Sequence, residues 1–253
     1  GIIYNAISGF KKNKLRQLFR SEEYEDHDES HSIRTDAREE MVPKSKIQVQ
    51  LLKPFISVQT PLCVLDIGCF DGALLNEINQ VYEAELLQGF DVSKRIKFPT
   101  SQPFKFTKDK IGKIGRKFDL IMLSHSLQYI DNLQNIFSEI KDLLKADGKV
   151  FIQTPNVAKK QNALSLGDQL YHFTPNILRG LLYKFGFRST IIESTLFPKD
   201  LLLVADQQPS KSFFDFFEDH EFVRTAINML VDLPNQVATE KCAGRFGIFG
   251  TAI

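Results

Sequence analysis

The run "LDIGCFDG" places one aspartate and two glycines where a strand passes into a helix. Asp66 follows an apolar stretch, and Gly68 and Gly72 precede "ALLNEINQVY", whose apolar positions recur at helical spacing. Glycines at such a turn let the main chain approach a ligand closely, and open α/β folds bind ligands at the carboxyl edge of the sheet. The spacing therefore predicts a site for a flat, nucleotide-like molecule.

The side chains of this turn distinguish a phosphate ligand from a cationic one. A dinucleotide requires Gly-x-Gly-x-x-Gly, with its pyrophosphate on the helix amino terminus. Here Phe70 stands at the second glycine, after Cys69, and the carboxylate of Asp71 stands at the mouth of the helix. A negative charge there repels pyrophosphate and favours an ammonium or a sulfonium. Because Asp91, at the end of the next strand, can accept both hydroxyls of a ribose, the pattern predicts a cationic ligand that carries a ribose.

These stretches resemble motif I and the following acidic strand end of the class I S-adenosylmethionine-dependent methyltransferases, in a variant whose middle glycine is replaced. The form "GCFDGALL" is most similar to sugar C-methyltransferases, and residues 117–156 resemble the family's fourth strand, helix and fifth strand. Over roughly residues 45–205, the resemblance implies S-adenosyl-L-methionine as cofactor and methyl transfer to a small-molecule or sugar-linked acceptor, such as a nucleotide sugar or a cell-surface glycan precursor. The cofactor-binding residues that it implies are Asp66, Gly68, Cys69, Phe70, Asp71, Gly72, Asp91, Asp109, Ser124 and His125.

Three residues are candidate catalytic groups under this resemblance, because methyl transfer requires alignment of the acceptor and removal of a proton. His125 follows the fourth strand, near the implied methionine end of the cofactor, and is either a base or a solvated loop histidine. Tyr171 and His172, in "DQLYHFTP", resemble a Tyr-His segment that carries base and acceptor contacts in sugar C-methyltransferases. The structural alternative is that Tyr171 packs and His172 caps the loop before Thr174. Residues 1–60 contain no cysteine, so the zinc site of those enzymes is not expected and the acceptor can differ.

The elements that must position these residues alternate between short apolar strands and amphipathic helices, which predicts an α/β fold. We expect a mostly parallel, doubly wound seven-stranded sheet of the Rossmann-like methyltransferase type. The runs "FRSTIIEST" and "DLLLVADQ" should form its antiparallel edge. A lead-in helix is expected at residues 44–55, a helix around Ile136 that ends at Gly148, and a helix that Thr174 caps and Gly186 ends.

Around this core the sequence predicts three parts. Residues 1–45 form an amino-terminal lid or cap segment, 46–207 the S-adenosylmethionine-binding domain, and 208–253 a helical segment and the start of a truncated further domain. The chain begins with Gly1 and ends in a strand-like run, which suggests a fragment. The Phe-rich helix at 211–233 either packs against a second domain, covers the acceptor site or forms a homodimer contact.

The composition of the chain limits the kinds of partner that we expect. Lys and Arg number 32 against 31 Asp and Glu, so no global field favours nucleic acid, and no nucleic-acid partner is expected. No apolar run approaches the length of a membrane span, and the three cysteines lack metal-ligand spacing, so we expect a cytoplasmic protein without membrane insertion or a metal. Two alternatives to the enzyme stay open: a catalytically degenerate methyltransferase fold that serves as a binding module, and a nicotinamide-dependent oxidoreductase.

Overall fold

The computed structural model describes residues 3–4, 17, 32–34, 41–57, 61–93, 104–108, 110–160 and 169–207. The statements below concern these residues only. Asp109, most of the predicted lid segment and the whole predicted segment 208–253 lie outside the described residues.

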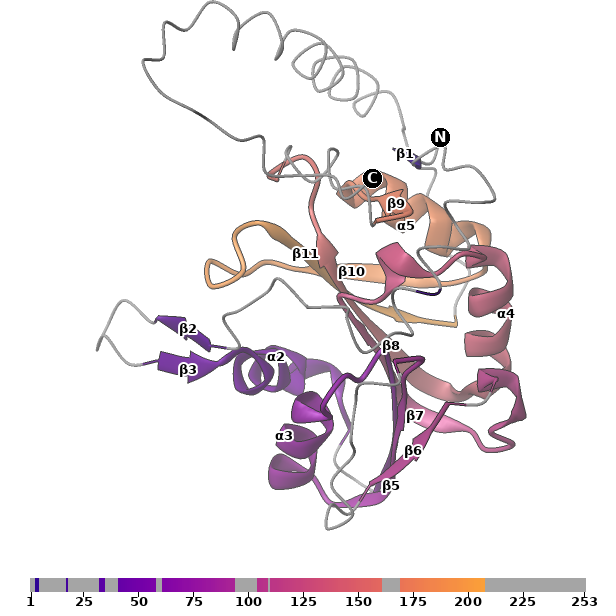
Figure 1. Ribbon diagram of the computed structural model, residues 1–253. Helices are drawn as coiled ribbons and strands as arrows, with labels where there is room; N and C mark the ends of the chain where they lie inside the picture. Colours follow the sequence, from indigo (N-terminus) through magenta and orange to yellow (C-terminus); the bar gives the residue numbers. More distant parts are fainter. Residues whose placement is uncertain are drawn as a thin grey trace, which may run out of the picture.

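A central sheet is formed by β4 (Leu62–Ile67), β5 (Ala84–Phe90), β6 (Lys105–Thr107), β7 (Phe118–Ser124), β8 (Leu144–Pro155), β10 (Arg188–Ile192) and β11 (Asp200–Asp206). These seven strands lie in the order β10-β11-β8-β7-β4-β5-β6 (Figure 1). Strands β4 to β8 pair in parallel, whereas β11 is antiparallel to both β8 and β10. The predicted mostly parallel sheet with an antiparallel edge is confirmed.

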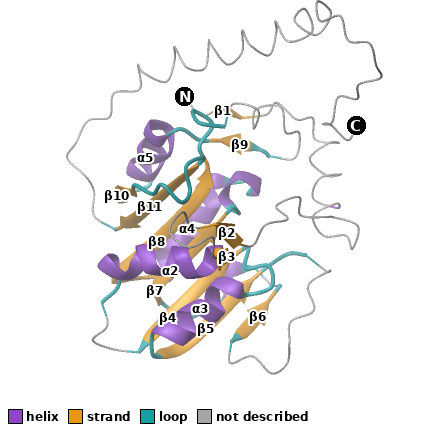
Figure 2. Cartoon of the chain, turned by 90° about the vertical axis from the view of Figure 1, so that its left-hand side faces the viewer, coloured by secondary structure: helices purple, strands orange, loops and turns teal. Residues whose placement is uncertain are grey.

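Helices cover both faces of this sheet. They are α2 (Lys44–Leu52), α3 (Ala73–Val81), α4 (Leu133–Leu143) and α5 (Pro175–Lys184), with 3₁₀ turns η1 (Lys53–Phe55), η2 (Ile111–Lys113) and η3 (Leu127–Tyr129). Helices α2 and α3 pack on one face, and α4 and α5 pack on the other (Figure 2). No helix within the described ranges has the length and apolarity that crossing a bilayer requires.

Two short strand pairs lie outside the main sheet. Strand β2 (Ser32–Arg34) pairs antiparallel with β3 (Met41–Pro43), which leads directly into α2. Strand β1 (Ile3–Tyr4) pairs antiparallel with β9 (Tyr171–His172), which precedes α5. Both pairs place amino-terminal residues beside elements that precede a helix of the core.

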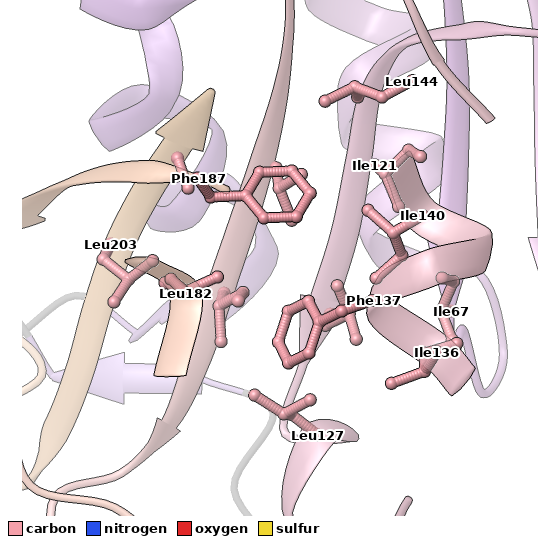
Figure 3. Packing of buried hydrophobic residues seen from close by; sticks show 14 of the residues in the cluster. Ile67, Ile121, Leu127, Ile136, Phe137, Ile140, Leu144, Leu182, Phe187 and Leu203 are labelled. Atoms are coloured by element: carbon pink, nitrogen blue, oxygen red, sulfur yellow. The ribbon is translucent and has the colours of Figure 1, made fainter. Parts of the chain in front are cut away.

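The central strands β4 and β7 are buried along all or most of their length because both faces of the sheet are covered. In β7, Ile121 and Leu123 pack against the face that α4 and α5 cover, whereas Leu120 and Met122 pack against the face of α2 and α3. Figure 3 shows the first of these clusters, where Phe137 of α4 lies beside residues of α5 and the sheet. Alternating side chains thus supply two hydrophobic layers from one strand.

The predicted end of the α4 helix at Gly148 is wrong. The helix ends at Leu143, and β8 begins at Leu144, which is buried and pairs with Phe118. Gly148 lies inside β8, where an added Cβ would lie 2.8 Å from the Leu144 side chain and 2.9 Å from the carbonyl oxygen of Phe118. The glycine therefore serves close packing within the strand. Pairing and burial at Leu144 override the helical spacing of the sequence.

The predicted limits of α5 hold. Thr174 Oγ1 accepts a hydrogen bond from the backbone N–H of Ile177 at 3.3 Å, which satisfies a free donor of the first turn. After the helix, Gly186 has a φ of +83°, the left-handed conformation that ends many helices. The cap, Pro175 and the glycine together fix the length of α5.

Candidate functional site

A cavity of about 730 Å³ opens at the carboxyl ends of β4, β5 and β7. The loops after these strands line one side, and Pro43, Lys44, Ser45 and Gln48 of the α2 region also line it. Parallel strands bring these loops to one edge because their carboxyl ends point the same way. Residues that are far apart in the sequence therefore meet at the predicted ligand-binding edge.

The turn after β4 brings its backbone to the wall of the cavity. Gly68 has a φ of +81°, and an added Cβ would lie 2.5 Å from Cβ of Ser126. Phe70 also adopts a left-handed φ, +45°, and its side chain is 40% exposed. Gly68, Cys69 and Phe70 line the cavity, whereas Gly72 does not belong to its lining. Gly72 instead provides room for the ring of Phe104, which would lie 2.7 Å from an added Cβ.

Asp66 is a buried carboxyl group that faces the cavity without a partner. The residue is 2% exposed, and its Oδ1 has no hydrogen-bond partner among the described residues. Burial, followed by the nearby carboxylates of Asp91 and Asp71, raises the pKa of Asp66 to about 8. An acid in this state favours a cation in the cavity, because a positive charge would stabilise its ionised form.

The other two carboxylates are fixed by backbone N–H groups. Asp91 Oδ2 accepts from Phe70 N at 3.0 Å, and its Oδ1 accepts from Ser93 N at 2.8 Å. Asp71 Oδ1 accepts from Ala73 N at 3.0 Å, in an Asx turn that leads into α3. Each carboxylate oxygen keeps a further lone pair for a ligand. Both residues line the cavity.

His125 lines the cavity from the end of β7 in a strained backbone conformation. Its φ is +51°, its N–H donates to the Gln153 carbonyl oxygen at 2.8 Å, and its own carbonyl oxygen accepts from Gln128 Nε2 at 2.9 Å. These bonds hold a conformation that is rare for non-glycine residues and common at functional sites. The imidazole Nε2 lies 3.3 Å from Oδ2 of Asp200, and the side chain is 33% exposed. The sequence-predicted candidate is thus paired with a carboxylate at the cavity wall.

Asp200, Gln153 and Gln48 were not anticipated from the sequence. Burial raises the pKa of Asp200, but the contact with His125 and the hydrogen bond from Gln153 outweigh this effect and lower it below the ordinary value. Gln48 Nε2 donates to Ser124 Oγ at 2.8 Å and to Gln153 Oε1 at 2.7 Å. Gln153 interrupts the apolar run "VFIQTP" and Gln48 stands between Ile47 and Val49, and such isolated polar residues were the available signal. Nothing in the local sequence marks Asp200.

The structure does not bring Tyr171 and His172 to the cavity. The Tyr171 hydroxyl donates a hydrogen bond to the carbonyl oxygen of Asp131 at 2.9 Å. Tyr171 thus contacts Asp131, which lines the cavity, without lining it itself. His172 is buried in β9, and neither ring nitrogen has a hydrogen-bond partner among the described residues. Burial lowers the pKa of His172 to about 4, which leaves the ring neutral. Thr174 caps α5 with its own hydroxyl, without a bond from His172.

A family model described as a methyltransferase domain matches residues 36–190, more than half of the chain. The chain belongs to this methyltransferase domain family. The prediction of a class I S-adenosylmethionine-dependent methyltransferase is confirmed at this level, and S-adenosylmethionine is the cofactor that the assignment implies. The finer resemblance to sugar C-methyltransferases has no support in the comparisons below.

Two curated relatives differ in their acceptors. The chain is 26% identical over 144 residues to a tRNA U34 carboxymethyltransferase of Campylobacter jejuni (strain RM1221), covering 53% of this chain and 49% of the relative. It is 28% identical over 139 residues to malonyl-[acyl-carrier protein] O-methyltransferase 1 of Coxiella burnetii, with the same shares of 53% and 49%. The chain thus spans about half the length of the curated relatives it matches.

A solved structure agrees with the fold. An S-adenosylmethionine-dependent methyltransferase from Listeria monocytogenes superposes with a TM-score of 0.52 at 19% identity, over 65% of this chain and 98% of the other. At this identity the likeness concerns the arrangement of helices and strands. It supports the doubly wound sheet described above.

The cavity has the chemistry that S-adenosylmethionine requires. Asp71 and Asp91 line the cavity beside Asp66, whose carboxyl has a raised pKa and would ionise next to a ligand that carries an ammonium and a sulfonium. The absence of a Cβ at Gly68 lets Ser126 pack against the turn at the cavity wall. These features fit a cation with a ribose and fit a pyrophosphate poorly.

Proposed function

We propose that this protein transfers the methyl group of S-adenosylmethionine to a small polar acceptor that enters the cavity at the carboxyl edge of the sheet. The observation that carries the proposal is the buried, unpartnered carboxyl of Asp66 beside two further cavity carboxylates. Ionisation of Asp66 in this buried position would be costly without a cationic ligand.

Under this proposal, the turn at Asp66, Gly68, Cys69, Phe70 and Asp71 holds the amino-acid end of the cofactor. When bound, the cofactor supplies a methyl group that a positively charged sulfur has activated. The chain's own residues orient the donor, exclude water and accept a proton. Gly72 contributes the shape of the turn without contacting the cavity.

The rest of the proposed cofactor site follows the next strands. Asp91 accepts the ribose hydroxyls with its remaining lone pairs. Ser124 and His125 border the methyl group at the end of β7. A role for Asp109 near the adenine stays a prediction, because this residue lies outside the described residues.

Among the three predicted catalytic residues, His125 is the one that lines the cavity. We assign to it the removal of a proton from the acceptor, because it is partly exposed and paired with Asp200. A base is needed when the acceptor presents an O–H or N–H group and is unnecessary for an ionised carboxylate. The proposed acceptor is therefore a hydroxyl or an amine.

The chemical class of the acceptor is open to a direct comparison. The names of the two curated relatives point to tRNA and to malonyl-[acyl-carrier protein], whereas the motif "GCFDGALL" points to a sugar-linked molecule. The two relatives are matched over only about half their length, so their acceptors do not transfer to this chain by similarity alone. Radiolabelled methyl transfer to nucleotide sugars, tRNA and malonyl-[acyl-carrier protein], measured side by side, distinguishes these classes.

Calorimetry with S-adenosylhomocysteine tests the proposal without an acceptor. We expect a dissociation constant on the order of micromolar, and about a hundredfold weaker binding for Asp91→Ala. Asp142→Ala is the matched control, because it removes an exposed carboxylate of α4 that does not line the cavity. Equal binding by both variants would remove Asp91 from the site.

The same experiment separates the proposed function from its rivals. No signal with the wild-type protein would favour a degenerate binding module. Tight binding of a nicotinamide dinucleotide in place of S-adenosylhomocysteine would favour an oxidoreductase. Either outcome would overturn methyl transfer as the activity of this chain.

A further inference from the structure

A chain of polar side chains crosses the core from α2 to His125. Gln48 Nε2 donates to Gln153 Oε1 at 2.7 Å, and Gln153 Nε2 donates to Oδ2 of Asp200 at 2.6 Å. The same Asp200 oxygen lies 3.3 Å from His125 Nε2. Gln48 and Gln153 are both buried, so neither amide can exchange these bonds for water. The chain joins α2, β8, β11 and the end of β7 at the cavity wall.

The direction of each amide in this chain is fixed by its neighbour. An amide has one accepting oxygen and one donating nitrogen, so Gln153 can present its nitrogen to Asp200 only while its oxygen receives a donor. Gln48 is that donor, and its Nε2 also donates to Ser124 Oγ at 2.8 Å. Gln48 therefore determines which end of Gln153 faces Asp200.

The effect of this arrangement reaches the histidine through Asp200. A donated hydrogen bond from Gln153 stabilises the ionised form of a largely buried carboxyl, and Lys160 is the other charged group that acts on it in the same direction. An ionised Asp200 holds a proton on Nε2 of His125 and leaves the lone pair on Nδ1. Burial of Asp200 acts against its ionised form, so loss of the amide bond would weaken the preference of Asp200 for one tautomer of His125.

We propose that Asp200, Gln153 and Gln48 are positioning residues that keep His125 as the Nε2-protonated tautomer, with Nδ1 as the nitrogen that receives the acceptor's proton. The proposal rests on the proposed function, since a base serves only a protonated acceptor. In the step it supports, the acceptor's electron pair forms the bond to the methyl carbon and the pair of the broken sulfur–carbon bond stays on sulfur. The acceptor's proton goes to Nδ1, and the imidazolium, held by Asp200, returns it to solvent through its exposed edge.

This assignment gives α2 a second role beside packing. The helix contributes Lys44 and Ser45 to the cavity and Gln48 to the buried amide chain. An apolar residue at position 48 would suit the core, where Ile47 and Val49 are also buried. The polar side chain is thus explained by its partners and not by packing. The packing of α2 on the sheet therefore also orients the proposed base.

Nuclear magnetic resonance of the histidine rings tests the proposal directly. In protein labelled with ¹⁵N at its five histidines, the His125 signals are assigned by comparison with His125→Asn. At about pH 8, where an imidazole is ordinarily neutral, we expect the wild-type His125 ring to show the Nε2-protonated tautomer. A ring protonated on Nδ1, or an even mixture, would overturn the proposal.

Gln48→Glu is the decisive variant because it is nearly isosteric and replaces the hydrogen-bond donor at position 48 with an acceptor. A carboxylate at position 48 accepts from Gln153, so the Gln153 oxygen turns toward Asp200, and the single tautomer of His125 should be lost. Gln50→Glu is the matched control, since it makes the same change on an exposed position of the same helix. Equal His125 spectra for the two variants would refute the role of Gln48.

A second variant separates loss of the fold from loss of the hydrogen-bonded amides. Gln153→Met removes the amide that donates to Asp200 without adding a buried charge, and Gln153 does not belong to the cavity lining. S-adenosylhomocysteine calorimetry reports whether the cavity is intact. We expect S-adenosylhomocysteine affinity within about twofold of wild type together with a loss of the single tautomer. An unchanged tautomer in a protein that binds normally contradicts the proposal. Because the tautomer is measured without an acceptor, its result is independent of whether methyl transfer itself is found.

Discussion

The two edges of the parallel sheet differ in how their charged residues are paired. At the amino edge, Asp119 Oδ2 accepts from Lys145 Nζ at 2.8 Å and from Cys63 N at 2.8 Å, and Arg116 pairs with Glu85 at 3.1 Å. At the carboxyl edge, no described Lys or Arg forms a salt bridge with Asp66, Asp71 or Asp91. The amino edge neutralises its charges internally, whereas the carboxyl edge presents them to the cavity.

The two edges also differ in backbone conformation. The residues with a left-handed φ that line the cavity, Gly68, Phe70 and His125, follow strands at the carboxyl edge. Such conformations are maintained only where surrounding contacts hold them. The comparison teaches that one edge of this fold is built for stability and the other for binding, and mutations at the two edges should therefore separate these properties.

The largest expected effect is the loss of binding in Gly68→Ala. The added Cβ would overlap Ser126 in a left-handed conformation, so we expect S-adenosylhomocysteine affinity to fall by at least about a hundredfold in calorimetry. Gly115→Ala is the control, because Gly115 also has a left-handed φ, +64°, but open surroundings. It should lose about 1–2 kcal/mol of unfolding free energy with normal binding. Equal loss of binding in both variants would show that backbone strain alone, and not the position at the carboxyl edge, causes the effect.

The next effect concerns the pH dependence that Asp66 confers. Its pKa is raised from 3.8 to about 8, so the folded free protein holds a proton between these values that the unfolded chain has released. The unfolding free energy should therefore fall as pH rises through this window, and affinity for the cationic ligand should rise, by up to about tenfold per pH unit. Calorimetry from about pH 6 to 8 on wild type and Asp66→Asn measures this slope.

The asparagine variant should bind more weakly at the upper end of that range and show almost no slope. Asp142→Asn, an exposed change on α4, should retain the wild-type slope. A slope that survives in Asp66→Asn would show that another group carries the proton. The asparagine should also stabilise the free protein near pH 8, because it removes a buried negative charge.

A smaller effect is expected at the amino edge. Lys145→Met removes the partner of Asp119, and because the Lys145 side chain is 41% exposed, solvent screening limits the loss to about 1 kcal/mol or less of unfolding free energy. S-adenosylhomocysteine affinity should be unchanged. Chemical denaturation and calorimetry on the same preparation check both parts. A loss of binding here would contradict the separation of the edges.

An effect that is expected only at acid pH concerns His172, a buried group away from the cavity without a hydrogen-bond partner among the described residues. Burial lowers its pKa from 6.5 to about 4, so the unfolded chain takes up a proton between these values that the folded protein does not. Unfolding free energy should fall as pH falls through this window, by at most about 1.4 kcal/mol per pH unit. His172→Leu should reduce this acid sensitivity in denaturation at about pH 7 and 5, with or without S-adenosylhomocysteine. A ligand-dependent change would connect His172 to the site.

Much of the fold was predictable because local and tertiary preferences agree. The apolar strands, the amphipathic face of α4 and the Thr174 cap of α5 each have a local signature that packing then reinforces. Gly148 is the instructive error, since the helical periodicity continues past Leu143 while the burial of Leu144 and its pairing with Phe118 begin the strand earlier. Tertiary packing decides where two such signals compete.

The sequence by itself determined the chemistry of the turn at residues 66–72. A glycine where backbone meets ligand, and carboxylates at successive strand ends, are local facts whose consequences follow from the direction of parallel strands. That is why Asp66, Gly68 and Asp91 could be named before the structure. The lining of the cavity agrees with that placement, and their roles stay part of the proposal.

Only the tertiary structure decided which groups surround His125. Gln48, Gln153 and Asp200 lie on α2, β8 and β11, up to 152 positions apart, and no local pattern relates them. It also placed the buried His172 in a strand that pairs with β1, away from the cavity that the sequence had suggested. The physical reason is that a hydrogen bond between distant side chains depends on how layers pack, and the packing is a property of the whole sheet.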